Sequence, residues 1–69
     1  MDDERLLQLD AAMAKLARFA PDLHALVEMR YFAGLSMEEL SAATALPLRT
    51  VEREWAKARA LLRKLMQEN

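Results

Sequence analysis

The sequence predicts an all-α fold, a four-helix bundle in which residues 1–69 form one domain. The chain has only 69 residues, so it can build a single small core. Good helix formers dominate, whereas one Gly and two Pro are too few turn formers for a β fold. Apolar residues recur at steps of three and four, which is the period of one helix face. They do so in four segments, at residues 3–19, 21–33, 37–44 and 47–66.

The first two predicted helices carry apolar stripes and no chemical motif. The stripe of the first consists of Leu6, Leu9, Met13, Leu16 and Ala17. Pro21 suits the start of the second helix, because the first helical residue needs no backbone N–H. The stripe of this expected central core helix consists of Leu23, Leu26, Val27 and Tyr31. Gly34 ends it, since Gly readily adopts the left-handed conformation found at helix ends.

The third predicted helix, residues 37–44, begins with a capping box. Ser36 stands at the cap and Glu39 follows three residues later, so each side chain can bind the other residue's backbone N–H. Leu40 and Ala43 are expected to face inward from this short helix. It is therefore expected to brace the helix that follows.

A tight turn at residues 45–47 leads into the fourth predicted helix, residues 47–66. Leu46 is expected to fill the turn, and Pro47 to be the first helical residue. Trp55 is expected in the core, as part of the most regular stripe in the chain. This stripe consists of Leu48, Val51, Trp55, Ala58, Leu62 and Leu65. The third and fourth helices thus predict a C-terminal helix-turn-helix, in which the second helix can lie in a DNA groove.

The polar face near the start of the fourth helix carries the residue types that contact DNA bases. It holds Arg49, Thr50, Glu52, Arg53 and Lys57. Arg pairs with guanine, Thr contacts a thymine methyl group or a phosphate, and Glu accepts a hydrogen bond from cytosine. Arg59, Arg63 and Lys64 follow one to three turns later and could meet phosphates or a protein partner.

The charge distribution agrees with this interpretation, although the net charge is only −1. Residues 1–46 hold four basic and eight acidic residues, a balance of −4, whereas residues 47–66 hold six basic and two acidic residues, a balance of +4. A domain polarised in this way presents a basic face while its total charge stays near zero. The plainer alternative is a helical bundle whose last helix carries solvated charges.

The composition argues against an enzyme, a metal site and a membrane protein. There is no cysteine, and His24 is the only histidine, so neither a metal cluster nor a nucleophile with its base can be assembled. We therefore expect no cofactor and no small-molecule ligand. No apolar run approaches the roughly 18 residues of a membrane span, and the acidic N-terminus is unlike a signal peptide. A cytoplasmic location is the expectation.

The sequence resembles region four of bacterial sigma factors, especially the extracytoplasmic-function class. The resemblance covers residues 7–66 and rests on the order and spacing of four short motifs. These are Arg30-Tyr31-Phe32-Ala33-Gly34-Leu35-Ser36, Glu38-Glu39-Leu40, Arg49-Thr50-Val51 and Ala58-Arg59-Ala60-Leu61-Leu62. It implies a domain that binds the −35 element of promoters and docks on the β flap of RNA polymerase, with an anti-sigma factor as a further partner. It also implies base reading by Arg49, Thr50, Glu52 and Arg53, and phosphate contact at Ser36 and Met37.

Three residues depart from the family pattern. Ala45 stands where Gly is common, which is tolerable only if the turn avoids a strongly left-handed backbone. Pro47 replaces the usual Ser cap, which removes a hydrogen bond worth about 1 kcal/mol. Glu52, close to Glu54, stands where Lys or Arg is frequent, and an acid facing phosphate weakens DNA binding.

Two alternatives to a DNA reader follow from the same features. One is a protein-interaction module that binds the β flap or an anti-sigma factor and has little DNA affinity of its own. The other is an effector helix-turn-helix of the response-regulator type, which commonly dimerises through its last helix. No region two, which melts the −10 promoter element, is present in residues 1–69, so we expect an excised domain more readily than a standalone protein.

Overall fold

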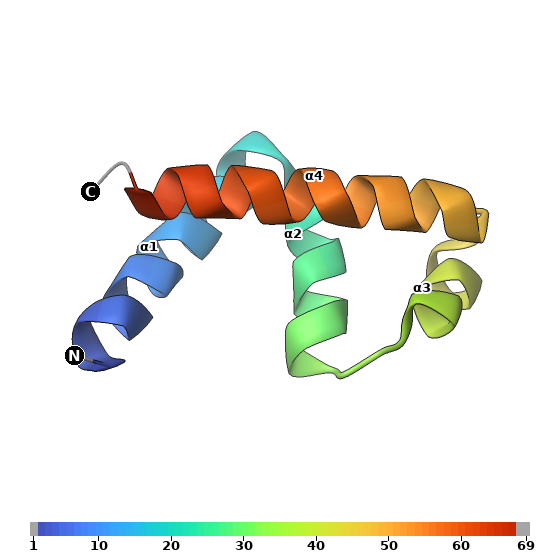
Figure 1. Cartoon of the computed structure of the whole chain (residues 1–69), viewed down its shortest axis with the longest axis horizontal. Helices are drawn as coiled ribbons and strands as arrows, with labels where there is room; N and C mark the ends of the chain where they lie inside the picture. Colours follow the sequence, from blue (N-terminus) through green and yellow to red (C-terminus); the bar gives the residue numbers. More distant parts are fainter. Residues whose placement is uncertain (1, 68–69) are drawn as a thin grey trace.

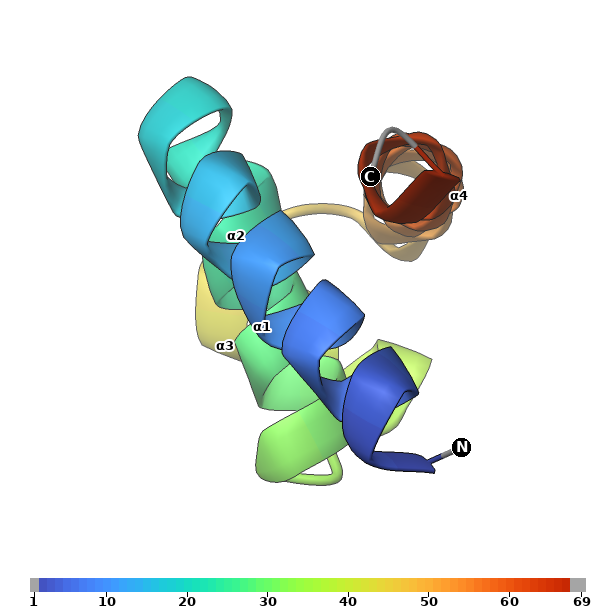
Figure 2. The ribbon, with the colours of Figure 1, turned by 90° about the vertical axis from the view of Figure 1, so that its left-hand side faces the viewer.

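The computed structural model describes residues 2–67, and within that range it contains only helices and their connections. α1 spans Asp2–Phe19, α2 spans Pro21–Val27, α3 spans Met37–Thr44 and α4 spans Leu48–Gln67; a π-helical segment, η1, continues α2 over Glu28–Phe32. α4 runs along most of the 36 Å length of the molecule (Figure 1). Seen along α4, the other helices lie on one side of it, and α1 and α2 lie next to each other (Figure 2). Both pack against α4.

The chain from α2 to η1 departs from the predicted uninterrupted helix over residues 21–33. In η1 the backbone bonds reach five residues back, so that Ala33 N–H donates to the Glu28 carbonyl over 3.1 Å. A π-turn holds more residues than an α-turn, and the side chains after it therefore point in new directions. Tyr31 is 61% exposed and Phe32 is 72% exposed. The prediction that Tyr31 belongs to the core stripe was wrong for this reason.

Two apolar clusters hold the helices together. The N-terminal cluster joins α1, α2 and α4 and consists of Ala12, Met13, Leu16, Val27, Ala58, Leu62 and Leu65. The helix-turn-helix cluster joins α2, α3 and α4 and consists of Leu26, Leu40 and Val51. Trp55 is half-buried against both clusters, and its ring lies 5.3 Å from that of Tyr31, centroid to centroid, at 58°. Trp55 thus joins the two clusters. The stripe had predicted a core position for it, but the structure leaves its side chain only half-buried.

Several predicted inward residues lie at the surface. Leu6 is 58% exposed, because the first turns of α1 diverge from α4 (Figure 1). Ala43 is exposed on α3. Leu46 is 40% exposed, so it only partly covers the turn that it was expected to fill. The core is therefore smaller than the periodicity of the sequence suggested.

Candidate nucleic-acid interface

The start of α3 is fixed by the predicted capping box, which the structure confirms. Ser36 Oγ accepts a hydrogen bond from the Glu39 N–H over 3.1 Å, and Glu39 Oε1 accepts one from the Ser36 N–H over 2.8 Å. Met37 is half-buried against the helix-turn-helix cluster. A phosphate at this helix start would therefore meet the Ser36 hydroxyl and backbone N–H groups rather than the Met37 side chain.

The turn between α3 and α4 adopts the backbone that its sequence was expected to avoid. Ala45 is left-handed, with φ 59° and ψ 25°. Hydroxyl groups hold this strained residue in place: Ser41 Oγ donates to the Leu46 carbonyl over 2.5 Å, and Thr44 Oγ1 donates to the Leu40 carbonyl over 2.7 Å. The Leu46 N–H in turn donates to Thr44 Oγ1 over 3.4 Å. The expectation that Ala45 would avoid the left-handed region was wrong, because these local bonds and the burial of Leu40 favour the turn.

The helix α4 begins at Leu48, one residue later than predicted. Pro47 occupies the cap, since its carbonyl accepts the first helical hydrogen bond, from the Val51 N–H over 3.0 Å. Proline has no side-chain acceptor with which to cap the helix. The position of α4 therefore depends on packing, above all on Leu40 and Val51, which are both 0% exposed.

The structure brings only part of the predicted site onto one open face. Arg49, Glu52 and Arg53 are all exposed in the first turns of α4. Arg49 and Arg53 are four residues apart and thus neighbours on one helix face. Thr50 is half-buried and lines a cleft beside α2 instead. Figure 1 shows that α3, with Ser36 before it, lies at the same end of the molecule as the start of α4.

Lys57, the last predicted contact, is already engaged on its own helix. Its Nζ lies 3.1 Å from Glu54 Oε2, in both an ion pair and a hydrogen bond. This ion pair was not predicted from the sequence, although the spacing of Glu54 and Lys57, three residues apart on a helix, could have indicated it. It leaves Arg49 and Arg53 as the exposed cations at the start of α4.

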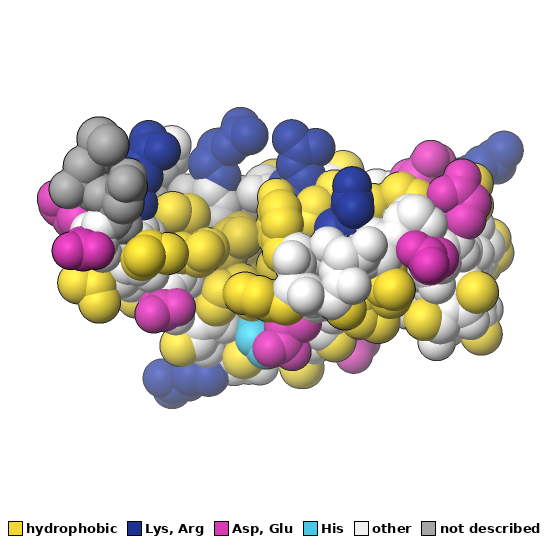
Figure 3. Space-filling model, turned by 90° about the horizontal axis from the view of Figure 1, so that it is seen from below, with side chains coloured by type: hydrophobic (Ala, Val, Ile, Leu, Met, Phe, Trp, Pro, Cys, Tyr) yellow, Lys and Arg dark blue, Asp and Glu magenta, His cyan; other side chains and the backbone are white. Residues whose placement is uncertain are grey.

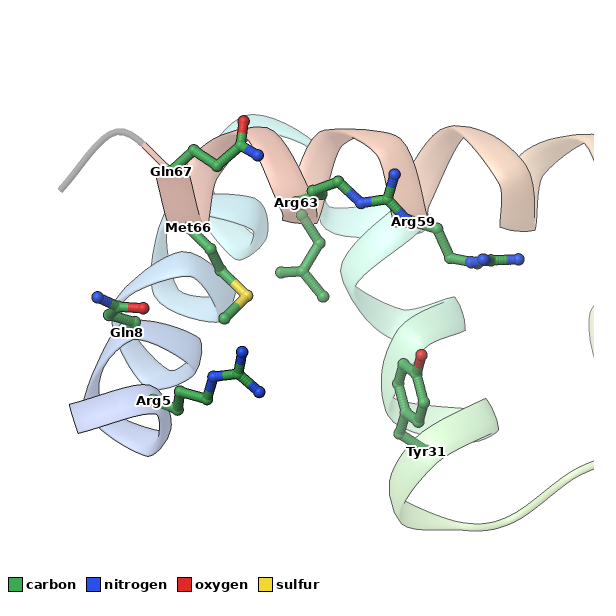
Figure 4. Close-up of a pocket in the computed structure, with 8 residues that line it drawn as sticks. Arg5, Gln8, Tyr31, Arg59, Arg63, Met66 and Gln67 are labelled. Carbon is green, nitrogen blue, oxygen red and sulfur yellow. The ribbon is translucent and has the colours of Figure 1, made fainter. Parts of the chain in front are cut away.

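A second surface, which the sequence did not predict, is an apolar groove between α1 and η1, beneath α4. Its apolar part is lined by Leu9, Met13, Val27, Tyr31, Phe32, Leu62 and Met66. Its basic rim includes Arg5, Arg59 and Arg63, which surround the opening together with Tyr31 (Figure 4). In the space-filling view, apolar side chains fill the hollow and basic ones project along the α4 edge (Figure 3). The adjacent aromatics Tyr31 and Phe32 were the available signal, because neighbours in a helix cannot both face one core.

Other kinds of site find little support in residues 2–67. This range contains no group of three or more His, Asp or Glu side chains that could hold a metal ion. His24 lies 3.7 Å from Glu28 on the next turn, measured from Nδ1 to Oε1. None of the helices in this range is both long and apolar enough to span a membrane.

Comparison with known proteins identifies the family. The family model of the ECF sigma factors matches residues 1–68. The chain belongs to the ECF sigma factor family. No curated protein and no solved structure gave a significant match. The resemblance drawn from the sequence is thereby confirmed, as is the all-α fold of the region-four type. As an ECF sigma factor, the protein acts in transcription initiation, and its family implies promoter DNA and RNA polymerase as partners.

Proposed function

We propose that this domain binds the −35 promoter element sequence-specifically, with α4 as the recognition helix. The observation that carries the proposal is the exposed pair Arg49 and Arg53 in the first turns of α4. The helix is braced by α3 through Leu40 and Val51, which are fully buried. A rigid support of this kind sets the depth at which side chains enter the major groove.

The residues of this face have separable roles in the proposal. Arg53 and Arg49 read guanine through O6 and N7, and Glu52 accepts a hydrogen bond from a cytosine amino group. Ser36 and the backbone N–H of Met37 bind phosphate at the start of α3. Glu52 repels phosphate, and Lys57 is partly neutralised by Glu54, so the isolated domain binds DNA weakly.

The test compares two basic residues of α4. Arg53→Ala should weaken binding to the preferred duplex by about 1–3 kcal/mol and relax base preference at one position. Lys64→Ala removes the same charge from the last turns of α4, where no base contact is proposed. It should weaken binding to all duplexes equally. Equal losses of specificity in both variants would contradict the proposed role of Arg53.

The apolar groove supports a second proposed function, docking on a protein partner such as the β flap of RNA polymerase or an anti-sigma factor. Tyr31 is 61% exposed and Phe32 is 72% exposed, and both line a concave surface. Contiguous exposed apolar surface of this kind marks sites of protein association. The groove lies between α1 and η1, whereas the proposed DNA face lies at the start of α4.

Two phenylalanines provide a matched test of this docking. Phe32→Ser should abolish capture of the polymerase β flap, whereas Phe19→Ser should leave it unchanged. Phe19 is 73% exposed, close to the 72% of Phe32, but it does not line the groove. Neither change should alter DNA affinity. Flap capture that is equal in the two variants would rule out the groove as the docking surface.

A further inference from the structure

A shallow depression next to the apolar groove is lined only by hydrogen-bond donors of neutral or positive charge. Its lining consists of Arg30, Tyr31, Trp55 and Arg59. Arginine and tryptophan side chains can only donate hydrogen bonds, and a tyrosine hydroxyl can donate one. No carboxylate lines the depression. The chemical character of the site is therefore that of an anion receptor.

Three of the four side chains of this depression, those of Arg30, Tyr31 and Trp55, already have partners within the domain. Arg30 Nη1 donates to the Leu35 carbonyl over 3.0 Å, which fixes the guanidinium and leaves most of its N–H groups available. The rings of Tyr31 and Trp55 pack at 5.3 Å. The Tyr31 hydroxyl points towards α4, where Arg59 extends from the helix (Figure 4). Neither arginine forms an ion pair within residues 2–67.

Two guanidinium groups near one another repel, and a bound anion relieves that repulsion while accepting their hydrogen bonds. Such charge-assisted bonds are about twice as strong as neutral ones. The depression is also continuous with the groove, because Tyr31 and Arg59 line both the depression and the basic rim, and Tyr31 reaches the apolar part. A ligand that fills the groove can thus place an anionic group in the depression.

We propose that the partner segment is an amphipathic helix whose apolar side chains fill the groove and whose carboxylate binds between Arg30 and Arg59. This inference rests on the second proposed function, docking in the groove. A carboxylate of a protein fits better than a DNA phosphate, because the phosphate backbone of DNA offers no apolar surface to cover Phe32 and its neighbours. Arg59 lies nearly two turns further along α4 than Arg53 and about 120° around the helix from it.

The test uses an array of 16-residue amphipathic helical peptides in which one Glu is moved through the polar positions. Each peptide has a partner with Gln in place of that Glu. Trp55 is the only tryptophan of the chain, so its fluorescence reports binding in the depression. At one position or more, the Glu peptide should bind about tenfold more tightly than its Gln partner. Arg59→Gln should remove this difference, and Lys64→Gln, at an exposed residue that lines neither the groove nor the depression, should keep it.

The possible outcomes distinguish failure of carboxylate binding between Arg30 and Arg59 from failure of docking in the groove. Glu and Gln peptides that bind equally at every position would overturn the carboxylate anchor and leave groove docking standing. Failure of every peptide to bind would overturn both. If Arg59→Gln weakens duplex binding more than Lys64→Gln does, the depression is a phosphate contact and the proposal is wrong. Arg59 is exposed, so thermal unfolding of the variants should match that of the original protein and show that they fold.

Discussion

The two ends of this domain are built around the same helix, α4, and differ in what they leave exposed. At the helix-turn-helix end, Leu40 and Val51 are 0% exposed, and the surface outside them is charged. At the groove end, Tyr31 and Phe32 are mostly exposed, and the surface is apolar. A closed core with charges outside suits DNA, whereas an open apolar groove suits a protein. One small domain thus presents two chemically distinct faces.

The largest expected difference between the two ends is in stability. Leu40→Ala should lower the free energy of unfolding by about 2–5 kcal/mol, because it leaves a cavity in a three-residue cluster. Phe32→Ala should change it by less than about 1 kcal/mol, since this side chain is 72% exposed. Urea unfolding followed by circular dichroism measures both. A larger loss from Phe32→Ala would mean that the groove is closed in solution.

The next largest effect is a loss of stability at the turn between η1 and α3. Gly34 has φ +74°, and a Cβ added there would meet no atom within 4 Å. Gly34→Ala should therefore destabilise the protein through backbone strain alone, by about 1–2 kcal/mol. Thermal unfolding tests this, with Gly34→Asn expected to cost less because Asn tolerates this conformation. If Ala is harmless here, the chain does not turn left-handed at this residue.

The opposite substitution, Ala to Gly, is expected to stabilise the protein at the turn between α3 and α4. Ala45 is left-handed, so Ala45→Gly should raise the free energy of unfolding by about 0.5–1 kcal/mol. Ala42→Gly, at an exposed position inside α3, is the matched control and should destabilise the protein. Urea unfolding shows whether each variant is more or less stable than the original protein. Destabilisation by Ala45→Gly would indicate that the turn differs from the one described.

The smallest expected effect is on DNA affinity, and it comes from a change of charge on the DNA face. Glu54→Gln should release Lys57 and increase affinity for any duplex about twofold at low salt, because an ion pair gives way to a phosphate contact. Asp10→Asn makes the same charge change on the exposed face of α1 and should have less effect. Fluorescence anisotropy at low and moderate salt measures this. An equal gain in both variants would show only a response to net charge.

The sequence predicted the elements that local chemistry defines. Ser36 and Glu39 fixed the start of α3, and the periodicity of the last segment predicted the buried Val51 and Leu62. The family also followed from the order of short motifs. Each of these features depends on residues close together in the chain, which is why they can be identified without a structure.

The remaining features depend on the folded backbone and on the packing of the helices, which the sequence pattern does not show. The π-turn of η1 changes the direction of Tyr31 and Phe32, and nothing in their local sequence requires it. Ala45 is left-handed against its own preference, because Ser41 and Thr44 stabilise the turn. The groove, and with it the depression at Arg59, exists only once α1 and η1 have packed against α4.

The most direct test of the central claim is anisotropy of this domain against a library of duplexes at two salt concentrations. We expect the domain to prefer one sequence class and to lose affinity steeply with added salt, because α4 neutralises several phosphates. Phe32→Ser should leave both results unchanged. Binding that does not depend on sequence, or that is flat with salt, would contradict the claim that α4 reads promoter DNA.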